Sequence, residues 1–216
     1  MDFSGAFTSD NLLFLLEGFY VTLKVAFISI VFSFIIGGLV GTLRFAKIPL
    51  LSKVLAVIVE LVRNLPLLLI ILFTYFALPE LGINLSITVS AIVALTIFES
   101  AMLAEIVRGG LNSIPKGQME AARSSGLSYV QALRLIILPQ ALRRMVPNLV
   151  SQFISLLKDT SLAVVIALPE LLHNAKIIQA QHPSYVIPIF LIISLMYFVV
   201  NYALSLVAKR LELKHA

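Results

Sequence analysis

The sequence lacks cysteine altogether, and its three histidines, His173, His182 and His215, are scattered along the chain. Without cysteine there is no disulfide bond, no thiolate metal site and no cysteine nucleophile. The histidines form neither an HExxH pattern nor a cluster, so the sequence predicts no metal ligands. We therefore expect neither metal-dependent nor covalent chemistry from this chain.

Charged residues are also scarce, at 12% of the chain, and the phosphate-binding pattern GxxxxGK[ST] does not occur. Without that loop and its lysine, the chain has no such site for a nucleoside triphosphate. We therefore expect that it does not hydrolyse ATP on its own and holds no cofactor. The formal net charge is +5, but the basic residues do not gather into one soluble basic face, so nucleic acid is not an expected partner.

Apolar residues, by contrast, are abundant. They make up 60% of the 216 residues, and the mean hydropathy is +1.03, which is too apolar for a soluble domain of this size. A membrane-spanning helix needs about 20 apolar residues, and five windows satisfy this: 19–43, 50–78, 85–107, 146–168 and 186–208. The second window is interrupted by Arg63, Asn64 and Pro66, which predicts a kink or two shorter helices. The sequence thus predicts an all-α integral membrane protein with five transmembrane helices.

The placement of lysine and arginine predicts the orientation of these spans. With the N-terminus outside, only Lys176 lies on the outer side, and Lys24, Arg63 and Lys158 lie within spans. The other basic residues are then cytoplasmic: Arg44, Lys47, Lys53, Arg108, Lys116, Arg123, Arg134, Arg143, Arg144, Lys209, Arg210 and Lys214. We therefore expect an extracytoplasmic segment at 1–18, a cytoplasmic loop at 109–145 and a cytoplasmic tail at 209–216. Glu170 and the loop from His173 to His182 are expected outside.

Within the cytoplasmic loop, residues 120–139 form a short, charged and helix-forming stretch between membrane-length apolar runs. A helix is predicted after Pro115, with small side chains that let another protein approach its backbone. Gly126 is predicted to end this helix, because glycine readily takes the left-handed conformation of a helix C-terminus. A second amphipathic helix is predicted from Ser128 to a stop at Pro139. The stretch is interpreted as a docking element rather than a span.

The same stretch fits the pattern EAA, three residues, G, nine residues, I, one residue, LP. The pattern is filled by Glu120, Ala121, Ala122, Gly126, Ile136, Leu138 and Pro139. It resembles the cytoplasmic loop of the permease subunits of bacterial ABC importers, and the surrounding residues are similar to the polar amino acid permeases of the histidine, glutamine and arginine type.

This resemblance implies a type I ABC importer permease fold over residues 19–208, in a multi-pass protein of the bacterial cytoplasmic membrane. It implies that Glu120, Ala121, Ala122 and Gly126 couple the chain to a separate ATP-binding subunit, which binds ATP and Mg²⁺ and is present in two copies. A second permease copy, identical or homologous, and an extracytoplasmic solute-binding protein are the other implied partners. The chain itself is then a non-catalytic transport subunit.

Polar residues on the fourth span suggest where a solute passes. Asn148, Gln152, Ser155 and Asp159 follow at spacings of four, three and four, which places them on one helical face. Such a stripe lines a route for a zwitterionic solute or, alternatively, makes hydrogen bonds between packed helices. Ser194, Tyr197, Asn201 and Ser205 form a similar stripe on the fifth span.

The family resemblance adds to this stripe. Residues 157–163, LKDTSLA, match a family segment in which relatives contact substrate, which implies substrate binding by Asp159 and Ser161. Asp159 is then expected to receive the substrate's ammonium group. The family's RGTPL pattern, by contrast, is replaced here by RNLPL, so this segment is interpreted as a hinge at Pro66.

For several other residues in the predicted spans, the sequence predicts only partners or packing. Glu60, Arg63 and Glu99 are ionisable groups within the predicted spans, where each needs a partner or a cavity. Glu105 and Arg108 are spaced for a structural ion pair on one helix. Gly37, Gly38 and Gly41 are expected to allow close packing of a neighbouring helix.

The leading hypothesis is that the chain imports a polar amino acid by alternating access, driven by the partner ATPase. Glutamine or glutamate is favoured over arginine, lysine or histidine, because a cationic side chain would call for more intramembrane carboxylates than Asp159. The alternatives are an ATP-independent secondary transporter or channel, in which Glu60, Glu99 and Asp159 relay protons, and a membrane scaffold protein. A cytoplasmic stretch of the EAA type is not needed by a proton relay, and the polar stripes are not needed by a scaffold.

Overall fold

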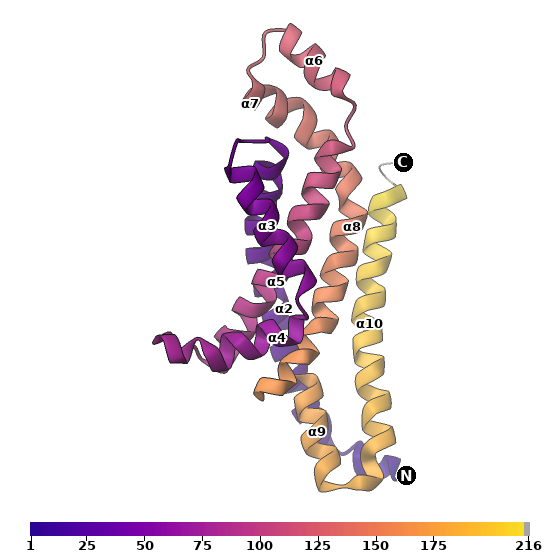
Figure 1. Cartoon of the computed structure of the whole chain (residues 1–216). Helices are drawn as coiled ribbons and strands as arrows, with labels where there is room; N and C mark the ends of the chain where they lie inside the picture. The colour runs from indigo at the N-terminus through magenta and orange to yellow at the C-terminus, as the bar shows by residue number, and fades with distance from the viewer. Residues whose placement is uncertain (214–216) are drawn as a thin grey trace.

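The computed structural model describes residues 1–213, with side chains described for residues 1–210. The end of the expected tail at 209–216, including Lys214, lies outside the described residues. Helices follow one another through the whole described chain (Figure 1). They comprise α1 (Phe3–Ala6), α2 (Ser9–Phe45), α3 (Leu51–Asn64), α4 (Leu67–Leu72), η1 (Phe73–Ala77), η2 (Pro79–Leu81), α5 (Ile87–Asn112), α6 (Lys116–Ser124), α7 (Tyr129–Ala132), η3 (Leu133–Ile137), α8 (Leu138–Asp159), η4 (Thr160–Ile166), α9 (Leu171–Gln181), η5 (Pro183–Tyr185) and α10 (Val186–Leu213).

Four continuous helical segments are long and apolar enough to cross a membrane: Ser9–Phe45, Ile87–Asn112, Tyr129–Ile166 and Pro183–Arg210. A fifth candidate span consists of α3 together with α4 and η1, which meet at a bend of 100°. The predicted break is therefore confirmed. Its cause is local, because Pro66 forces the preceding residue, Leu65, into an extended conformation.

The helices α2 and α5 run side by side and make the most extensive contact of the bundle. Glycines permit this closeness: a Cβ added at Gly37 would lie 2.7 Å from Leu103 Cβ, and one added at Gly41 would lie 2.5 Å from the Ala104 carbonyl oxygen. Gly38 has nothing near its missing Cβ. The predicted packing role thus holds for Gly37 and Gly41 and is wrong for Gly38.

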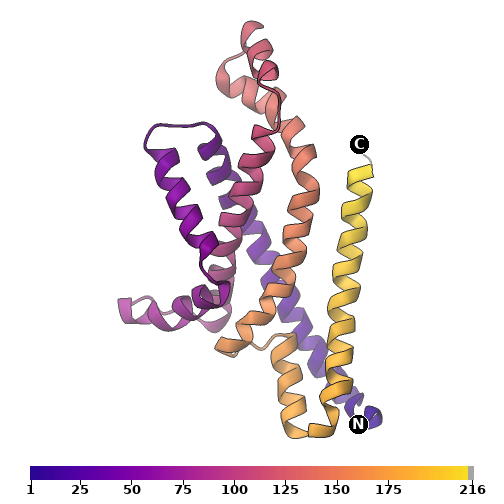
Figure 2. The same ribbon diagram turned by 45° about the vertical axis from the view of Figure 1, so that its right-hand side comes forward.

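The bundle has two distinct ends, which Figures 1 and 2 both show. The helices α6 and α7 project from one end, on the side where α10 ends. The N-terminus and the short helix α9 lie at the other end, and the segment formed by α4 and η1 projects sideways. At 37 residues and a rise of 1.5 Å per residue, α2 is about 55 Å long and extends beyond a hydrocarbon layer of about 30 Å.

Two local predictions are wrong. Pro139 was expected to stop a helix, but it lies in the first turn of α8, where a missing N–H is tolerated, and a π-helical turn, η3, joins α7 to α8. The segment from His173 to His182 was expected as an external loop, but most of it forms α9. Leu171, Ala175 and Ile178 of this helix are buried against α2 and α10, so tertiary packing stabilises it.

Candidate functional site

The helix α6 carries most of the predicted coupling residues, and its end is built as the sequence predicts. Gly126 has a φ of +86°, in the left-handed region. Its N–H donates to the Arg123 carbonyl at 3.1 Å, and the Leu127 N–H donates to the Ala122 carbonyl at 3.2 Å. These two bonds form a Schellman motif, which satisfies carbonyl groups at the end of the helix.

Little of α6 is used for packing within the chain. Ala122 is its only buried residue, whereas Glu120, Ala121 and Arg123 are exposed. The main contacts of α6 are with α7 and η3, beyond the end of the main bundle (Figure 1). The helix therefore leaves most of its surface free for contact with another protein.

The connection from α6 to the bundle is nevertheless well defined. Ser128 forms a capping box with Gln131: the Gln131 N–H donates to Ser128 Oγ at 3.3 Å, and the Ser128 N–H donates to Gln131 Oε1 at 2.8 Å. The Arg123 guanidinium donates to the Leu127 carbonyl at 2.8 Å. From α7 the helix continues through η3 into α8. A displacement of α6 would thus be transmitted directly to a membrane-spanning helix.

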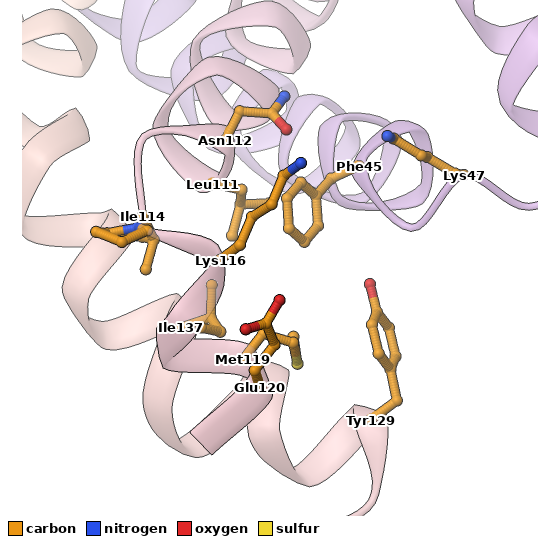
Figure 3. Close-up of a pocket in the computed structure, with 11 residues that line it drawn as sticks. Phe45, Lys47, Leu111, Asn112, Ile114, Lys116, Met119, Glu120, Tyr129 and Ile137 are labelled. Atoms are coloured by element: carbon orange, nitrogen blue, oxygen red, sulfur yellow. The ribbon is translucent and has the colours of Figure 1, made fainter. Parts of the chain in front are cut away.

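A cavity of about 310 Å³ separates α6 and α7 from the end of α2. Figure 3 shows the Glu120 carboxylate, the Lys116 ammonium group and the Tyr129 hydroxyl around this cavity, with Phe45 and Lys47 on its far side. Within the part of the chain whose side chains are described, Glu120 has no ion pair within 4 Å. Its charge is therefore available to a cation from outside the chain.

Of the predicted substrate residues, only Gln152 forms a hydrogen bond with another side chain within the described residues. Gln152 on α8 donates to Glu99 Oε2 on α5 at 3.2 Å, and Glu99 is only 1% exposed. Asp159 is half-buried at the last residue of α8, and the Ser161 hydroxyl in η4 donates to the Lys158 carbonyl at 2.8 Å.

The remaining members of the stripe differ in their surroundings. Ser155 is half-buried, whereas Asn148 is exposed. Glu99 Oε1 has no hydrogen-bond partner within the described residues. On the polar face of α8, Gln152 therefore makes a hydrogen bond to α5, whereas Asn148 makes no side-chain hydrogen bond within the described residues.

A larger ion cluster than predicted surrounds Glu105. Arg108 forms hydrogen bonds with its carboxylate, as predicted from their spacing. Arg44 on α2 also donates to Glu105 Oε2 at 2.8 Å, and Arg63 Nη1 on α3 lies 3.8 Å from the same oxygen. The cluster thus joins three helices. Sequence reasoning missed the two distant partners, because no sequence spacing links them to Glu105.

Sequence reasoning also missed the role of Glu170: it was expected on the outer side with no assigned contact, and its side chain is completely buried. Its carboxylate caps α9 by accepting from the N–H groups of Leu172, at 3.0 Å, and His173, at 2.7 Å. It also accepts from the Tyr197 hydroxyl at 3.2 Å. Burial raises the pKa of Glu170, while these hydrogen bonds oppose the shift. The signal in the sequence is an acidic residue directly before an apolar helical pattern.

The sequence and the fold were compared with known proteins. Residues 29–214 match the model of the family described as binding-protein-dependent transport system inner membrane component. The chain is 68% identical, over 99% of both chains, to the probable glutamine ABC transporter permease protein GlnP of Bacillus subtilis (strain 168). It is 39% identical, over 94% of both chains, to the probable glutamine ABC transporter permease protein GlnM of the same organism.

A solved structure of an amino acid ABC transporter with histidines contains a chain of the same fold. The two chains superimpose with a TM-score of 0.90, at 30% sequence identity and over 99% of each. The type I ABC importer permease fold and the family resemblance predicted from the stretch around Glu120 are thereby confirmed. The chain belongs to the family of binding-protein-dependent transport system inner membrane components, as a permease subunit of an amino acid ABC importer.

Proposed function

We propose that this permease subunit imports glutamine and that ATP hydrolysis by a separate subunit drives the transport. The observation that carries the proposal is α6, a helix with one buried residue that displays Glu120, Ala121 and Ala122 of the EAA pattern at one end of the bundle. The choice of glutamine is supported by the names of the two Bacillus subtilis relatives. A neutral side chain also agrees with the small number of carboxylates near the polar stripe.

In this proposal α6 inserts into a groove on the ATP-binding subunit, which holds ATP and Mg²⁺. Two such subunits bind two permease copies, and their closure moves the two α6 helices together. Because α6 is joined to α8 through the capped helix α7, this movement shifts the membrane-spanning helices. The transporter alternates between states because nucleotide binds one of them more tightly.

The proposed orientation places α6 and the C-terminus in the cytoplasm and the N-terminus and α9 outside. It is supported by the excess of lysine and arginine in the loops at the α6 end. A solute-binding protein then delivers glutamine at the α9 end. The assembly lies in the cytoplasmic membrane of a bacterium.

The proposed route for glutamine follows the polar face of α8. Asp159 receives the ammonium group, and Ser161, Ser155, Gln152 and Asn148 supply further polar contacts. Support comes from the contact of Gln152 with Glu99, whose second oxygen has no partner within the described residues. A buried carboxylate of this kind is costly inside a membrane unless it serves a ligand or a pathway.

The proposal is tested by reconstituting the permease with its cognate ATP-binding subunit and binding protein in liposomes. ATP-dependent uptake is measured for radiolabelled glutamine, glutamate, histidine and arginine. Glutamine uptake that requires both ATP and the binding protein is expected. Glutamine flux without ATP would instead support a secondary transporter, and a preference for another amino acid would refute the substrate assignment.

The coupling role is tested with Glu120→Arg, which reverses the free charge on α6. We expect uptake to fall by more than tenfold while the chain remains inserted. In the proposed complex Glu120 pairs with a cation of the ATP-binding subunit, and breaking a pair that the interface buries costs roughly 3 kcal/mol. Gln181→Arg, at the exposed end of α9, introduces the same side chain at the opposite end and serves as the control. Normal uptake by Glu120→Arg would remove this residue from the coupling contact.

The substrate route is tested with Asp159→Asn, which keeps the shape of the side chain and removes its charge. The apparent affinity for glutamine is expected to fall by about tenfold, because a charge-assisted hydrogen bond to the ammonium is weakened. Lys53→Gln removes one charge from an exposed position of α3 and should leave the affinity unchanged. An unaltered affinity in Asp159→Asn would exclude Asp159 from the site.

A further inference from the structure

The ion cluster around Glu105 carries more positive than negative charge. Arg44, Arg63 and Arg108 all lie within 4 Å of the Glu105 carboxylate. Within the described residues, no second carboxylate lies within 4 Å of these arginines. Two positive charges are therefore left uncompensated on membrane-spanning helices, where unpaired charge is unfavourable.

Donor groups in this cluster also remain available. Arg63 Nη1 is 3.8 Å from Glu105 Oε2, which is too long for a hydrogen bond. The side chains of Arg63 and Arg108 are each 37% exposed, whereas that of Arg44 is 8% exposed. A guanidinium has five N–H donors and matches the oxygens of a phosphate group. The exposed side of the cluster can therefore bind an anion with phosphate oxygens.

A groove of about 200 Å³ lies next to the cluster, between α2, α3 and α5. Its lining is almost entirely apolar and includes Val40, Val62 and Ala101. Val40 and Ala101 stand one helical turn before Arg44 and Glu105, and Val62 directly precedes Arg63. The groove thus lies beside the arginines.

Two hydroxyl groups in the groove point to an occupant. Thr96 and Ser100 line it, are 8% and 7% exposed, and have no hydrogen-bond partner within the described residues. Buried hydroxyl groups normally have a partner, and leaving them unpaired is unfavourable. An occupant with acceptor atoms between an anionic head and an apolar chain would satisfy them.

We propose that this groove binds one anionic phospholipid, with its phosphate on Arg63 and Arg108. One acyl chain lies in the apolar groove beside Thr96, and an ester carbonyl close to the phosphate accepts from Ser100, which lies about 8 Å before Glu105 along α5. The arginines lie at a depth where lipid phosphates are found. At 26 residues α5 is about 39 Å long and exceeds the hydrocarbon layer, so its last turns, which carry Arg108, reach the head groups. Positive charge at one end of an apolar groove matches an anionic lipid and does not match an apolar surface of a second copy.

Native mass spectrometry of the complete complex tests this proposal. The complex, in detergent, is titrated with phosphatidylglycerol or with phosphatidylcholine, and the number of lipids retained per permease chain is counted. The wild type is expected to retain phosphatidylglycerol at lower concentration than phosphatidylcholine. In Arg63→Gln the concentration needed for phosphatidylglycerol should rise roughly fivefold, while that for phosphatidylcholine stays the same.

Lys53→Gln is the matched control, because it removes one positive charge from an exposed position of the same helix, α3. It should bind phosphatidylglycerol as the wild type does. Equal loss in Lys53→Gln and Arg63→Gln, or no preference between the two lipids, would overturn the proposal.

A cross-linking experiment distinguishes a lipid from a second permease copy. The chain has no cysteine, so Ile58→Cys provides a single thiol at the groove. With a lipid in the groove, little disulfide-linked dimer is expected on oxidation. Extensive dimer formation would show that a second copy covers the groove and would refute the lipid assignment.

Discussion

The short helices at the two ends of the bundle differ in how much of their surface is buried. At one end α6 buries a single residue, Ala122, and exposes most of its surface. At the other end α9 buries Leu171, Asn174, Ala175 and Ile178, and the completely buried Glu170 caps it. Both are short helices that follow a membrane-spanning segment, yet only the second is part of the core.

This difference agrees with the proposed roles of the two helices, in which α6 contacts another subunit and α9 stabilises the fold. Polar contacts bind α9 to its neighbours: the Leu171 N–H donates to Thr22 Oγ1 at 3.2 Å, and Asn174 Nδ2 donates to the Phe14 carbonyl at 2.7 Å. The helix α6 depends instead on local caps at Gly126 and Ser128. Substitutions at the α6 end should therefore impair transport, and substitutions at the α9 end should impair folding.

The largest effect is expected from Gly126→Pro. Proline fixes φ near −65°, whereas Gly126 has a φ of +86°, and it removes the N–H that donates to the Arg123 carbonyl. The cost is roughly 3 kcal/mol, confined to the α6 end. ATP-dependent glutamine uptake by the reconstituted complex should fall by more than tenfold, while the thermal midpoint of the chain changes little.

Gly117→Ala is the control within the same helix, because a Cβ there would meet no atom within 4 Å. It should preserve uptake. If Gly126→Pro lowered the thermal midpoint as strongly as a core substitution, the α6 end would belong to the core and the comparison of the two ends would fail.

Glu170→Ala should have the next largest effect. It leaves the N–H groups of Leu172 and His173 and the hydroxyl of Tyr197 without their acceptor. Burying unsatisfied donors costs about 2 kcal/mol, so the thermal midpoint in detergent should fall measurably. Glu170→Gln retains an acceptor oxygen and should lose less. A variant Glu170→Ala as stable as the wild type would show that α9 is held by its apolar contacts alone.

A smaller effect is expected from Ser128→Ala, which removes the side-chain half of the capping box. An N-cap serine contributes about 1 kcal/mol, so hydrogen exchange should accelerate in α7 and leave the amides of α9 unchanged. Ser124→Ala alters an exposed serine of α6 and is the control. Faster exchange in α9 as well would contradict the independence of the two ends.

Several features could be predicted because they depend on neighbouring residues. The break between α3 and α4 follows from Pro66, and the end of α6 follows from Gly126. The pair of Glu105 with Arg108 follows from a spacing of three residues. In contrast, the prediction for Pro139 was wrong. A proline is compatible both with the end of one helix and with the first turn of the next, and the surrounding sequence does not distinguish the two.

The amino-acid sequence by itself determined that the chain has membrane-length apolar helices, that one of them breaks at Pro66, and where the EAA pattern lies. It could do so because apolar length, proline, glycine and the EAA pattern act locally. Only the tertiary structure decided that Glu170 is buried, that α9 folds back onto α2 and α10, and that three arginines share Glu105. These features join residues far apart in the chain, and burial and pairing of that kind exist only once the helices pack.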